Sequence, residues 1–423
     1  MANRRYSDRQ RSSNTYSDDF YIGMSYEYGQ LSSDRRRRER ARKLAAKRRR
    51  TKNRIKLIAL GVVTLVIVIS LVVGICSGIK SCVSDDSGFK TAKVSADASK
   101  KAKSNVAGKA NSEEALQFVK VQIEDNNKKG MFSSQNGAVY LWNKSAYEIF
   151  GASADRSDMY AEVINKATKH LGDDIKVYAA MIPLHAEMNL PERLKAEAGC
   201  SSQADNIYNA YSKFDKAQPI NIYNVLAEHN KEYLYFNSDH HWTGLGAYYA
   251  YTAFCEQTNQ KPMTISEEGT HSIEGFTGSF HTYGTGLKDT VNYYDLPYDT
   301  SCTLYSDPAS DGQPADVYYA NPEAGENTYG VFINGDQPKF IIDSACESGK
   351  KIAVIKESFG NAFVPYLSAN YSEVHVLDMR YCGITNLKKY CEDNEIKEVM
   401  FINNIMSANS AERIEDIEKI IGR

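Results

Sequence analysis

Residues 351–402 read KIAVIKESFGNAFVPYLSANYSEVHVLDMRYCGITNLKKYCEDNEIKEVMFI. Short apolar runs alternate here with helical segments, which predicts strands at 351–356, 373–377 and 398–402 and helices at 360–369 and 384–395. Strands that alternate with helices in this way form a parallel sheet with helices on both faces. Ligands bind beyond the carboxyl ends of such strands, so we expect function just after Lys356, Leu377 and Ile402.

The preceding sequence extends the same α/β fold. Residues 176–182 lie in the run IKVYAAMIP, which is apolar throughout, as expected of a strand covered on both faces. We also expect helices at 112–126 and 159–171 and a short strand at 137–142. Residues 264–335 are rich in Gly, Tyr, Asp, Thr and Ser with weak periodicity. They predict a loop-rich insertion that could shape a substrate groove.

The composition limits the class of protein. The chain has 423 residues, of which 42% are hydrophobic and 25% charged. These values exclude collagen-like, wholly disordered and multi-span membrane proteins, and the length fits one large domain with appendages. The net charge of −2 hides an asymmetry, because residues 1–56 carry 18 Lys/Arg against 6 Asp/Glu and the remainder carries 33 against 47. The two parts therefore meet different surroundings.

A single apolar segment separates these two parts. Residues 57–79 contain no charged side chain, and as a helix they would cover roughly 34 Å, enough to cross a bilayer. A cleavable signal peptide is the alternative, but its apolar region is usually about 7–15 residues long and begins near the N-terminus. No later stretch is apolar over about 18 residues, so we expect a single-pass membrane protein.

The charges around this segment predict its orientation. Residues 35–56 hold 14 Lys/Arg, so the positive-inside rule places the N-terminus in the cytoplasm and the C-terminal part outside the cell membrane. We expect residues 1–56 to be a disordered basic tail that meets anionic lipid rather than nucleic acid. Residues 80–111 have the composition of a flexible stalk. The folded domain is then 112–423.

A candidate general base lies in the string NSDHHWT. Asp239 and His241 are two residues apart, so the carboxylate can accept the imidazole Nδ1 proton and leave Nε2 free as a base. The alternative is a turn that only caps a helix at 244–257 through Thr243. A metal site using Asp239, His240 and His241 is a further alternative, although the chain has no C-x-x-C pair and we expect no metal or other cofactor.

A candidate nucleophile lies in the string ESFG, between the first strand and the first helix of 351–402. Ser358 would present its Oγ above the sheet, where the first free N–H groups of the helix point toward a developing oxyanion. A serine that only caps the helix is the alternative. A hydroxyl at this position together with an Asp-His pair favours a hydrolase or an acyltransferase.

At this point the sequence resembles a known family. The strings DHHW (239–242), TGLGAYYAY, ESFGNAF (357–363) and DMRY (378–381) resemble the DHHW family of bacterial surface proteins, which are similar to the SGNH-like O-acetyltransferases of alginate assembly. The resemblance covers roughly residue 136 to the C-terminus. It implies an SGNH-hydrolase-like fold with Ser358 as nucleophile, His241 as base and Asp239 as the residue that orients the base.

The sequence departs from the SGNH pattern before the nucleophile, where Lys356 and Glu357 replace the usual glycine and aspartate. For the oxyanion hole, the best-placed candidates are Gly278 in FTGSF and Asn403 or Asn404 after the last strand. The remaining candidates for substrate binding are two. Trp242 could pack or form a wall of the site, and Arg380 could pair with substrate or with Glu357, or be solvated.

The resemblance implies a membrane-anchored, extracytoplasmic enzyme that forms an acyl-enzyme on Ser358 and passes an acetyl group to or from a cell-surface polysaccharide. A multi-span membrane-bound O-acyltransferase would be the partner that supplies the acyl group. The main alternative is a catalytically inactive carbohydrate-binding or assembly-scaffold protein, which the replacement by Lys356 and Glu357 favours. A metal-dependent polysaccharide deacetylase is the third.

Overall fold

The computed structural model describes residues 116–133, 139–320 and 323–422. The expected basic tail, apolar span and stalk all lie outside these residues. Within the described ranges, no helix has both the length and the apolar character that a bilayer crossing requires. The six cysteines in the described part of the chain are all free.

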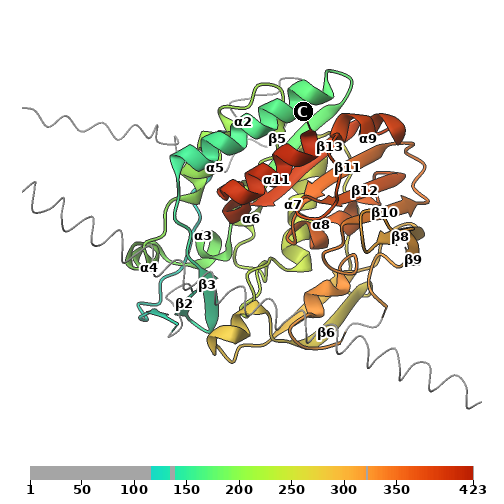
Figure 1. Cartoon of the computed structure of the whole chain (residues 1–423). Coiled ribbons are helices and arrows are strands. Elements are labelled where there is room, and N and C mark those ends of the chain that lie inside the picture. Colours follow the sequence, from blue (N-terminus) through green and yellow to red (C-terminus); the bar gives the residue numbers. More distant parts are fainter. Residues whose placement is uncertain (1–115, 134–138, 321–322, 423) are drawn as a thin grey trace, which may run out of the picture. The chain divides into compact units, whose positions relative to one another are not determined.

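An eight-stranded sheet is the centre of the described part of the chain (Figure 1). Its strands run in the order β5-β4-β13-β11-β12-β10-β8-β9. Their bounds are β4 Lys176–Ile182, β5 Gln218–Pro219, β8 Thr300–Tyr305, β9 Gln313–Ala315, β10 Lys339–Ser344, β11 Lys351–Lys356, β12 Glu373–Asp378 and β13 Glu398–Asn404. Neighbours from β5 to β12 are parallel, whereas β10, β8 and β9 add on antiparallel.

The parallel part confirms the strands predicted at 176–182, 351–356, 373–377 and 398–402, and it confirms a mixed α/β domain. A purely parallel sheet was the wrong prediction, because one edge is antiparallel. Two of the edge strands, β8 and β9, come from the predicted insertion. Their residues are largely polar and half-buried, which is typical of an antiparallel edge and gives no continuous apolar run in the sequence.

Helices cover both faces of the sheet (Figure 1). Helix α2 packs with α5, α9, α10 and α11 on one face, and α7 packs with α6 and α8 on the other. The helices are α2 Ala154–Leu171, α3 His185–Asn189, α4 Glu192–Ala198, α5 Gln203–Tyr211, α6 Tyr223–Glu228, α7 Gly244–Gln257, α8 Gly360–Leu367, α9 Leu387–Asp393, α10 Ile405–Ala408 and α11 Ala411–Ile421. The predicted helices at 159–171, 244–257, 360–369 and 384–395 are confirmed, with α2 starting earlier and α9 shorter than expected.

The helix predicted at 112–126 is wrong over its described part, because residues 117–126 contain no helix. Tertiary contacts hold this segment instead. Phe118 is buried with its ring edge-on to Tyr223 of α6, and the Val119 N–H donates to Asn224 Oδ1 at 3.0 Å. These contacts to a distant helix outweigh the local preference of the segment.

Two small sheets accompany the central one. The first contains β1 Met131–Phe132, β2 Val139–Trp142 and β3 Ser145–Glu148, so the strand predicted at 137–142 exists but not in the central sheet. The second is a hairpin of β6 Thr270–Phe276 and β7 Asp289–Tyr294, joined through the short 3-10 helix η3 Ser279–Tyr283. Together with η4 Thr328–Val331, this hairpin lies in the predicted insertion, which has the expected loops and short strands.

Candidate active site

Ser358 lies in the turn between β11 and α8, at the carboxyl edge of the parallel strands. The turn is closed by the Gly360 N–H, which donates to Glu357 O at 2.9 Å, and by the Asn361 N–H, which donates to Ser358 O at 3.1 Å. A Cβ on Gly360 would come within 2.6 Å of Lys356 Cβ, so the chain can turn this tightly only with glycine there. The Ser358 hydroxyl is thereby presented above the sheet.

Asp239 and His241 lie in the loop before α7. The Phe236 N–H donates to His241 O at 3.2 Å, and Thr243 caps α7 by accepting the Gly246 N–H at 3.2 Å, so both ends of the loop are fixed. Asp239 Oδ1 is 2.6 Å from His241 Nδ1 and accepts the His241 N–H at 2.9 Å. The carboxylate therefore fixes both the backbone and the ring of the histidine.

The structure brings the two motifs together. His241 Nε2 is 2.7 Å from Ser358 Oγ, so Asp239, His241 and Ser358 form one line of hydrogen bonds. Asp239 and His241 are 4% and 7% exposed, which shields this line from water. Burial opposes ionisation of Asp239, but the charge and hydrogen bonds of His241 outweigh it and hold the pKa of this carboxyl far below its usual value. The acceptor for Nδ1 is thus a carboxylate.

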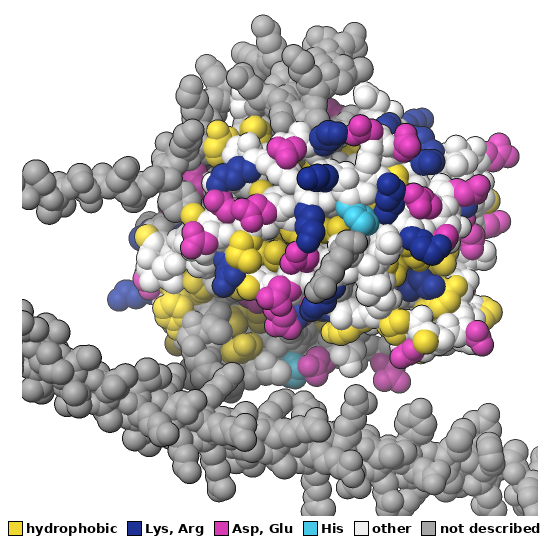
Figure 2. All heavy atoms as spheres, turned by 45° about the horizontal axis from the view of Figure 1, so that its top comes forward, with side chains coloured by type: hydrophobic (Ala, Val, Ile, Leu, Met, Phe, Trp, Pro, Cys, Tyr) yellow, Lys and Arg dark blue, Asp and Glu magenta, His cyan; other side chains and the backbone are white. Residues whose placement is uncertain are grey.

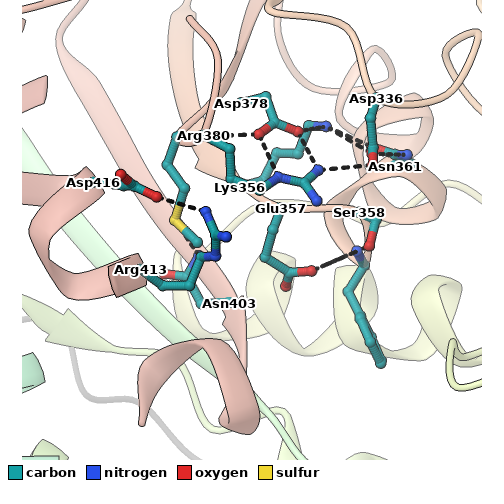
Figure 3. Close-up of polar contacts among 12 residues, drawn as sticks. Asp336, Lys356, Glu357, Ser358, Asn361, Asp378, Arg380, Asn403, Arg413 and Asp416 are labelled. Atoms are coloured by element: carbon teal, nitrogen blue, oxygen red, sulfur yellow. Dashed lines mark hydrogen bonds and ion pairs between the residues drawn. The ribbon is translucent and has the colours of Figure 1, made fainter. Parts of the chain in front are cut away.

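Glu357 holds the turn against the end of β13. Its Oε1 accepts the Asn404 N–H at 2.9 Å. Its carboxylate, drawn in Figure 3, also points to its own turn, where Oε2 accepts the Phe359 N–H at 3.1 Å. Burial raises the pKa of this carboxyl. The N–H groups of Phe359, Gly360 and Asn361 all donate to acceptors within the turn. The Ser358 N–H, in contrast, has no acceptor among the described residues. It can face an oxyanion formed next to Oγ.

The residues predicted for the oxyanion hole all have structural contacts. Asn403 is fully buried, with its Oδ1 accepting from Tyr160 at 3.0 Å, and Asn404 Oδ1 caps α10 by accepting the Ser407 N–H at 3.0 Å. Gly278 has a φ of 61° and packs against the loop of Asp239, because a Cβ added to it would come within 2.2 Å of Ser238 O. The assignment of the two asparagine side chains and of Gly278 to the oxyanion hole stays a prediction. From sequence alone, an asparagine after a strand that caps a helix looks the same as one that contacts the substrate.

Arg380 pairs with two aspartates, and among the described residues it forms no ion pair with Glu357; its pairing with substrate stays a prediction. Its guanidinium binds Asp378 at 2.8 and 2.6 Å and Asp336 at 2.8 Å, and it is largely buried. Lys356 Nζ completes this cluster, 2.9 Å from Asp378 Oδ2 and 2.7 Å from Asn361 Oδ1 (Figure 3). The five side chains converge directly beside the Glu357–Ser358 turn.

Trp242 is a packing residue. It is fully buried, and its Nε1 donates to Phe359 O at 2.8 Å, so it joins the Asp-His loop to the serine turn. His240 is 30% exposed, and its Nδ1 is 2.7 Å from Ser279 Oγ. Sequence patterns gave no signal for Ser279, whose N–H also donates to Asp239 Oδ2 at 2.7 Å. Ser279 belongs to the insertion and is distant along the chain from both the NSDHHWT and the ESFG motifs.

A metal ion could be held only at the expense of this arrangement. Possible ligand atoms of Asp239, His240 and His241 lie within 4.8 Å of one another. However, both ring nitrogens of His241 are engaged, Nδ1 with Asp239 and Nε2 with Ser358. A metal bound to His241 would have to displace one of these contacts, so the donor set fits a general base better than a metal ligand.

Comparison with known proteins agrees with the motifs. The model of the DHHW protein family matches residues 110–377. This chain belongs to the DHHW family. A crystal structure of a DHHW family protein from Eubacterium siraeum is similar, with a TM-score of 0.63 and 27% identity, covering 70% of this chain and 100% of that one.

Two further solved structures are similar to this DHHW chain. Bacillus cereus PatB1, in a structure with a sulfonyl adduct, has a TM-score of 0.53 at 18% identity and covers 66% of this chain and 99% of its own. The O-acetyltransferase domain of Pseudomonas putida AlgJ has a TM-score of 0.39 at 12% identity and covers 66% and 98%. No curated protein matches the sequence. The likeness to PatB1 supports the fold.

Proposed function

We propose that this DHHW chain is a serine-dependent O-acyltransferase or esterase in which Ser358 is the nucleophile, His241 the general base and Asp239 the residue that orients the base. The observation that supports this proposal is the continuous contact from Asp239 Oδ1 through His241 to Ser358 Oγ, at 2.6 and 2.7 Å. The 2.7 Å distance from His241 Nε2 to Ser358 Oγ lies in the range expected of a base and a nucleophile that exchange a proton. The 2.6 Å distance from Asp239 Oδ1 to His241 Nδ1 lets the carboxylate orient the ring.

The reaction would proceed in two halves. In the first, Ser358 Oγ attacks the acyl carbonyl while its proton passes to His241 Nε2, and Asp239 stabilises the imidazolium. The negative oxygen faces the Ser358 N–H, and the tetrahedral intermediate collapses as the leaving oxygen takes the proton from His241. In the second half, a sugar hydroxyl or a water loses its proton to His241 and attacks the carbonyl of the acyl-enzyme, and Ser358 Oγ leaves as it takes that proton back from His241.

The substrate side of the proposal rests on family membership. We propose acetyl as the acyl group and a cell-surface polysaccharide as donor or acceptor, with the chain anchored by one membrane span, its domain outside the membrane and a membrane-bound O-acyltransferase as partner. On the face seen in Figure 2, basic and acidic side chains of the described residues are intermixed. This mixture argues against recognition of a polyanion through bulk charge.

The first test uses Ser358→Ala in the full-length protein. We expect the wild type to release p-nitrophenol from its acetyl ester and to be labelled at Ser358 by an arylsulfonyl fluoride, a probe suggested by the adduct named for PatB1. Ser358→Ala should lose both signals. Asp239→Asn should keep the fold and lower kcat by about four orders of magnitude, because the wrong tautomer of the histidine is then favoured.

The control is Ser410→Ala, because Ser410 also precedes a helix and its side chain makes no capping bond there. It should leave activity and labelling unchanged. Activity or labelling that persists in Ser358→Ala removes Ser358 as nucleophile. A wild-type protein that binds glycan without esterase activity or labelling supports the inactive scaffold instead.

A further inference from the structure

We propose that Tyr329, a residue of the loop-rich insertion, is a positioning residue that holds the imidazole of His241 and the turn of Ser358 in one fixed geometry. The inference rests on the proposed function, since it assigns Tyr329 to the same site. Neither sequence motif contains this residue, and it lies in η4, between the β6–β7 hairpin and β10 along the chain.

The ring of Tyr329 lies flat on the ring of His241. The two ring centroids are 4.0 Å apart and the planes differ by 9°. Asp239 and Ser358 contact the two ring nitrogens of His241, and the rings of His240 and Phe359 pack on it at angles of 37° and 53°. Tyr329 adds the parallel surface that opposes tilting of the ring out of its plane, so Nε2 keeps pointing at Ser358 Oγ.

The hydroxyl of Tyr329 reaches the other half of the site. It donates to Ser358 O at 3.2 Å, and Phe359 O lies at 3.4 Å from the same oxygen. Burial raises the pKa of Tyr329 well above its usual value, so the hydroxyl stays protonated and remains a donor. One side chain thus contacts the base through its ring and the nucleophile's backbone through its hydroxyl.

The surroundings of Tyr329 make it rigid. It is 7% exposed, and the rings of Phe236 and Phe332 pack edge-on against it at 6.2 and 5.3 Å. Thr328 ties the start of η4 to the preceding loop by accepting the Gly325 N–H at 2.9 Å. A held tyrosine can transmit the position of the insertion to both catalytic elements, which a mobile one could not.

The stacking also has an electrostatic consequence. During the proposed reaction His241 becomes an imidazolium, and a cation over the face of a tyrosine ring is attracted by the ring quadrupole. The interaction is therefore stronger in the transition state than in the ground state, which is the condition for an effect on kcat rather than on KM.

The experiment compares Tyr329→Phe and Tyr329→Leu with the wild type, all as full-length protein. Three quantities are measured: kcat and KM for p-nitrophenyl acetate, the rate of sulfonyl labelling of Ser358, and the downfield proton signal of the His241–Asp239 hydrogen bond. Tyr329→Phe keeps the ring and should lower kcat by about 3- to 10-fold; Tyr329→Leu loses both contacts and should lower it by about 30- to 100-fold. KM should stay within about 2-fold, and the downfield signal should persist in Tyr329→Phe and broaden or disappear in Tyr329→Leu.

The matched control is Tyr318→Leu. Tyr318 is a half-buried tyrosine of the same insertion that packs on Tyr293 and Phe332 and whose hydroxyl has no hydrogen-bond partner among the described residues. It should lower the melting temperature without changing kcat or the downfield signal. A Tyr329→Leu variant that retains wild-type kcat, or that loses activity only in proportion to its stability as Tyr318→Leu does, overturns the inference.

Failure of the proposed function would give a different result from failure of the positioning role of Tyr329. If the wild type is not labelled at Ser358, the reaction is wrong, but the downfield signal still decides the role of Tyr329. An unchanged signal in Tyr329→Leu then overturns the positioning role, and its loss in Tyr329→Leu with retention in Tyr329→Phe supports it.

Discussion

At the scale of single residues, the departure from the SGNH pattern at Lys356 and Glu357 has a physical explanation. Glu357 reaches the Asn404 N–H of the neighbouring strand while it holds the Phe359 N–H of its own turn. Lys356 is fully buried between Asp378 and Asn361. Both side chains stabilise the turn, although Glu357 Oε2 also lies 3.4 Å from Ser358 Oγ. Ser358 Oγ still lies 2.7 Å from His241 Nε2, so the replacement does not by itself favour an inactive protein.

Lys356→Met tests the buried cluster. Removing the cation leaves the carboxylates of Asp378 and Asp336 with Arg380 alone, and the loss of one partner from a buried ion pair costs about 3–5 kcal/mol. We expect urea unfolding to show a loss of this size and sulfonyl labelling of Ser358 to slow. The double variant Lys356→Met/Asp336→Asn keeps the Asp378–Arg380 pair and should recover part of the stability.

The comparison for this prediction is Lys389→Met on α9. Lys389 also pairs with an aspartate, Asp393 at 2.8 Å, but both side chains are exposed. Exposed pairs contribute little to stability. Equal losses from the two methionine variants would contradict the importance assigned to the buried cluster.

At the scale of elements, the β6–β7 hairpin binds the loop that carries the candidate base. The Ser279 N–H binds Asp239 Oδ2 at 2.7 Å, and the Phe280 N–H binds Ser238 O at 3.0 Å. On the same loop, Asp289 of β7 accepts the Ser238 N–H at 2.6 Å and the Asn237 amide at 2.9 Å. The hairpin therefore holds the loop that carries Asp239 and His241 from both sides.

Gly278→Ala tests whether contacts from the hairpin position the loop of Asp239 and His241. Gly278 has φ 61°, and a Cβ there would come within 2.2 Å of Ser238 O and 2.7 Å of Asp239 Cβ. We expect η3 to shift away from Asp239, with a loss of about 1–3 kcal/mol in stability and about 10- to 100-fold in kcat. Unfolding curves and esterase kinetics measure the two effects.

Gly284→Ala separates backbone strain from the clash. Gly284 ends the same 3-10 helix at φ 72°, and nothing lies within 4 Å of its added Cβ. It should lose stability from strain alone and keep its kcat. If both alanine variants lose activity equally, the close approach of Gly278 to the loop is not what orients Asp239.

At the scale of the whole molecule, the sequence predicted what depends on neighbours along the chain. The strands 351–356, 373–377 and 398–402 are short, largely apolar runs, and their alternation with helices implied the parallel arrangement that β11, β12 and β13 have. Ser358, His241 and Asp239 were predictable because each lies in a compact motif. The antiparallel edge could not be predicted in this way, and neither could the contacts of Ser279, Asp336 and Tyr329. These contacts join segments that lie apart in the chain and share no sequence pattern.

Stability should fall in mild acid because of His185. Its ring stacks at 5.3 Å on Tyr235 and its Nδ1 has no partner among the described residues, and burial lowers its pKa from 6.5 to about 4. The unfolded chain therefore binds one more proton between pH 6.5 and 4, so the folded state is favoured fully above pH 6.5 and progressively less below it. The expected loss at pH 5 is about 2 kcal/mol.

Urea unfolding at pH 7.5 and pH 5 measures this effect. His185→Phe and His185→Gln carry no titrating ring, so the loss of stability between the two pH values should be smaller in both by about 2 kcal/mol. A wild-type pH dependence that both variants retain would assign it to other groups.

The strand order has a consequence for biosynthesis. β13, the last of the described strands along the chain, lies between β4 and β11 and is bonded to both. A nascent chain that has not yet released residue 404 has a gap in the middle of its sheet, and Glu357 has no amide of Asn404 to bind. Assembly of the proposed reactive centre must therefore wait until residue 404 has left the ribosome. Until then β4 and β11 each keep one edge without its partner strand, although β4 can pair with β5 and β11 with β12.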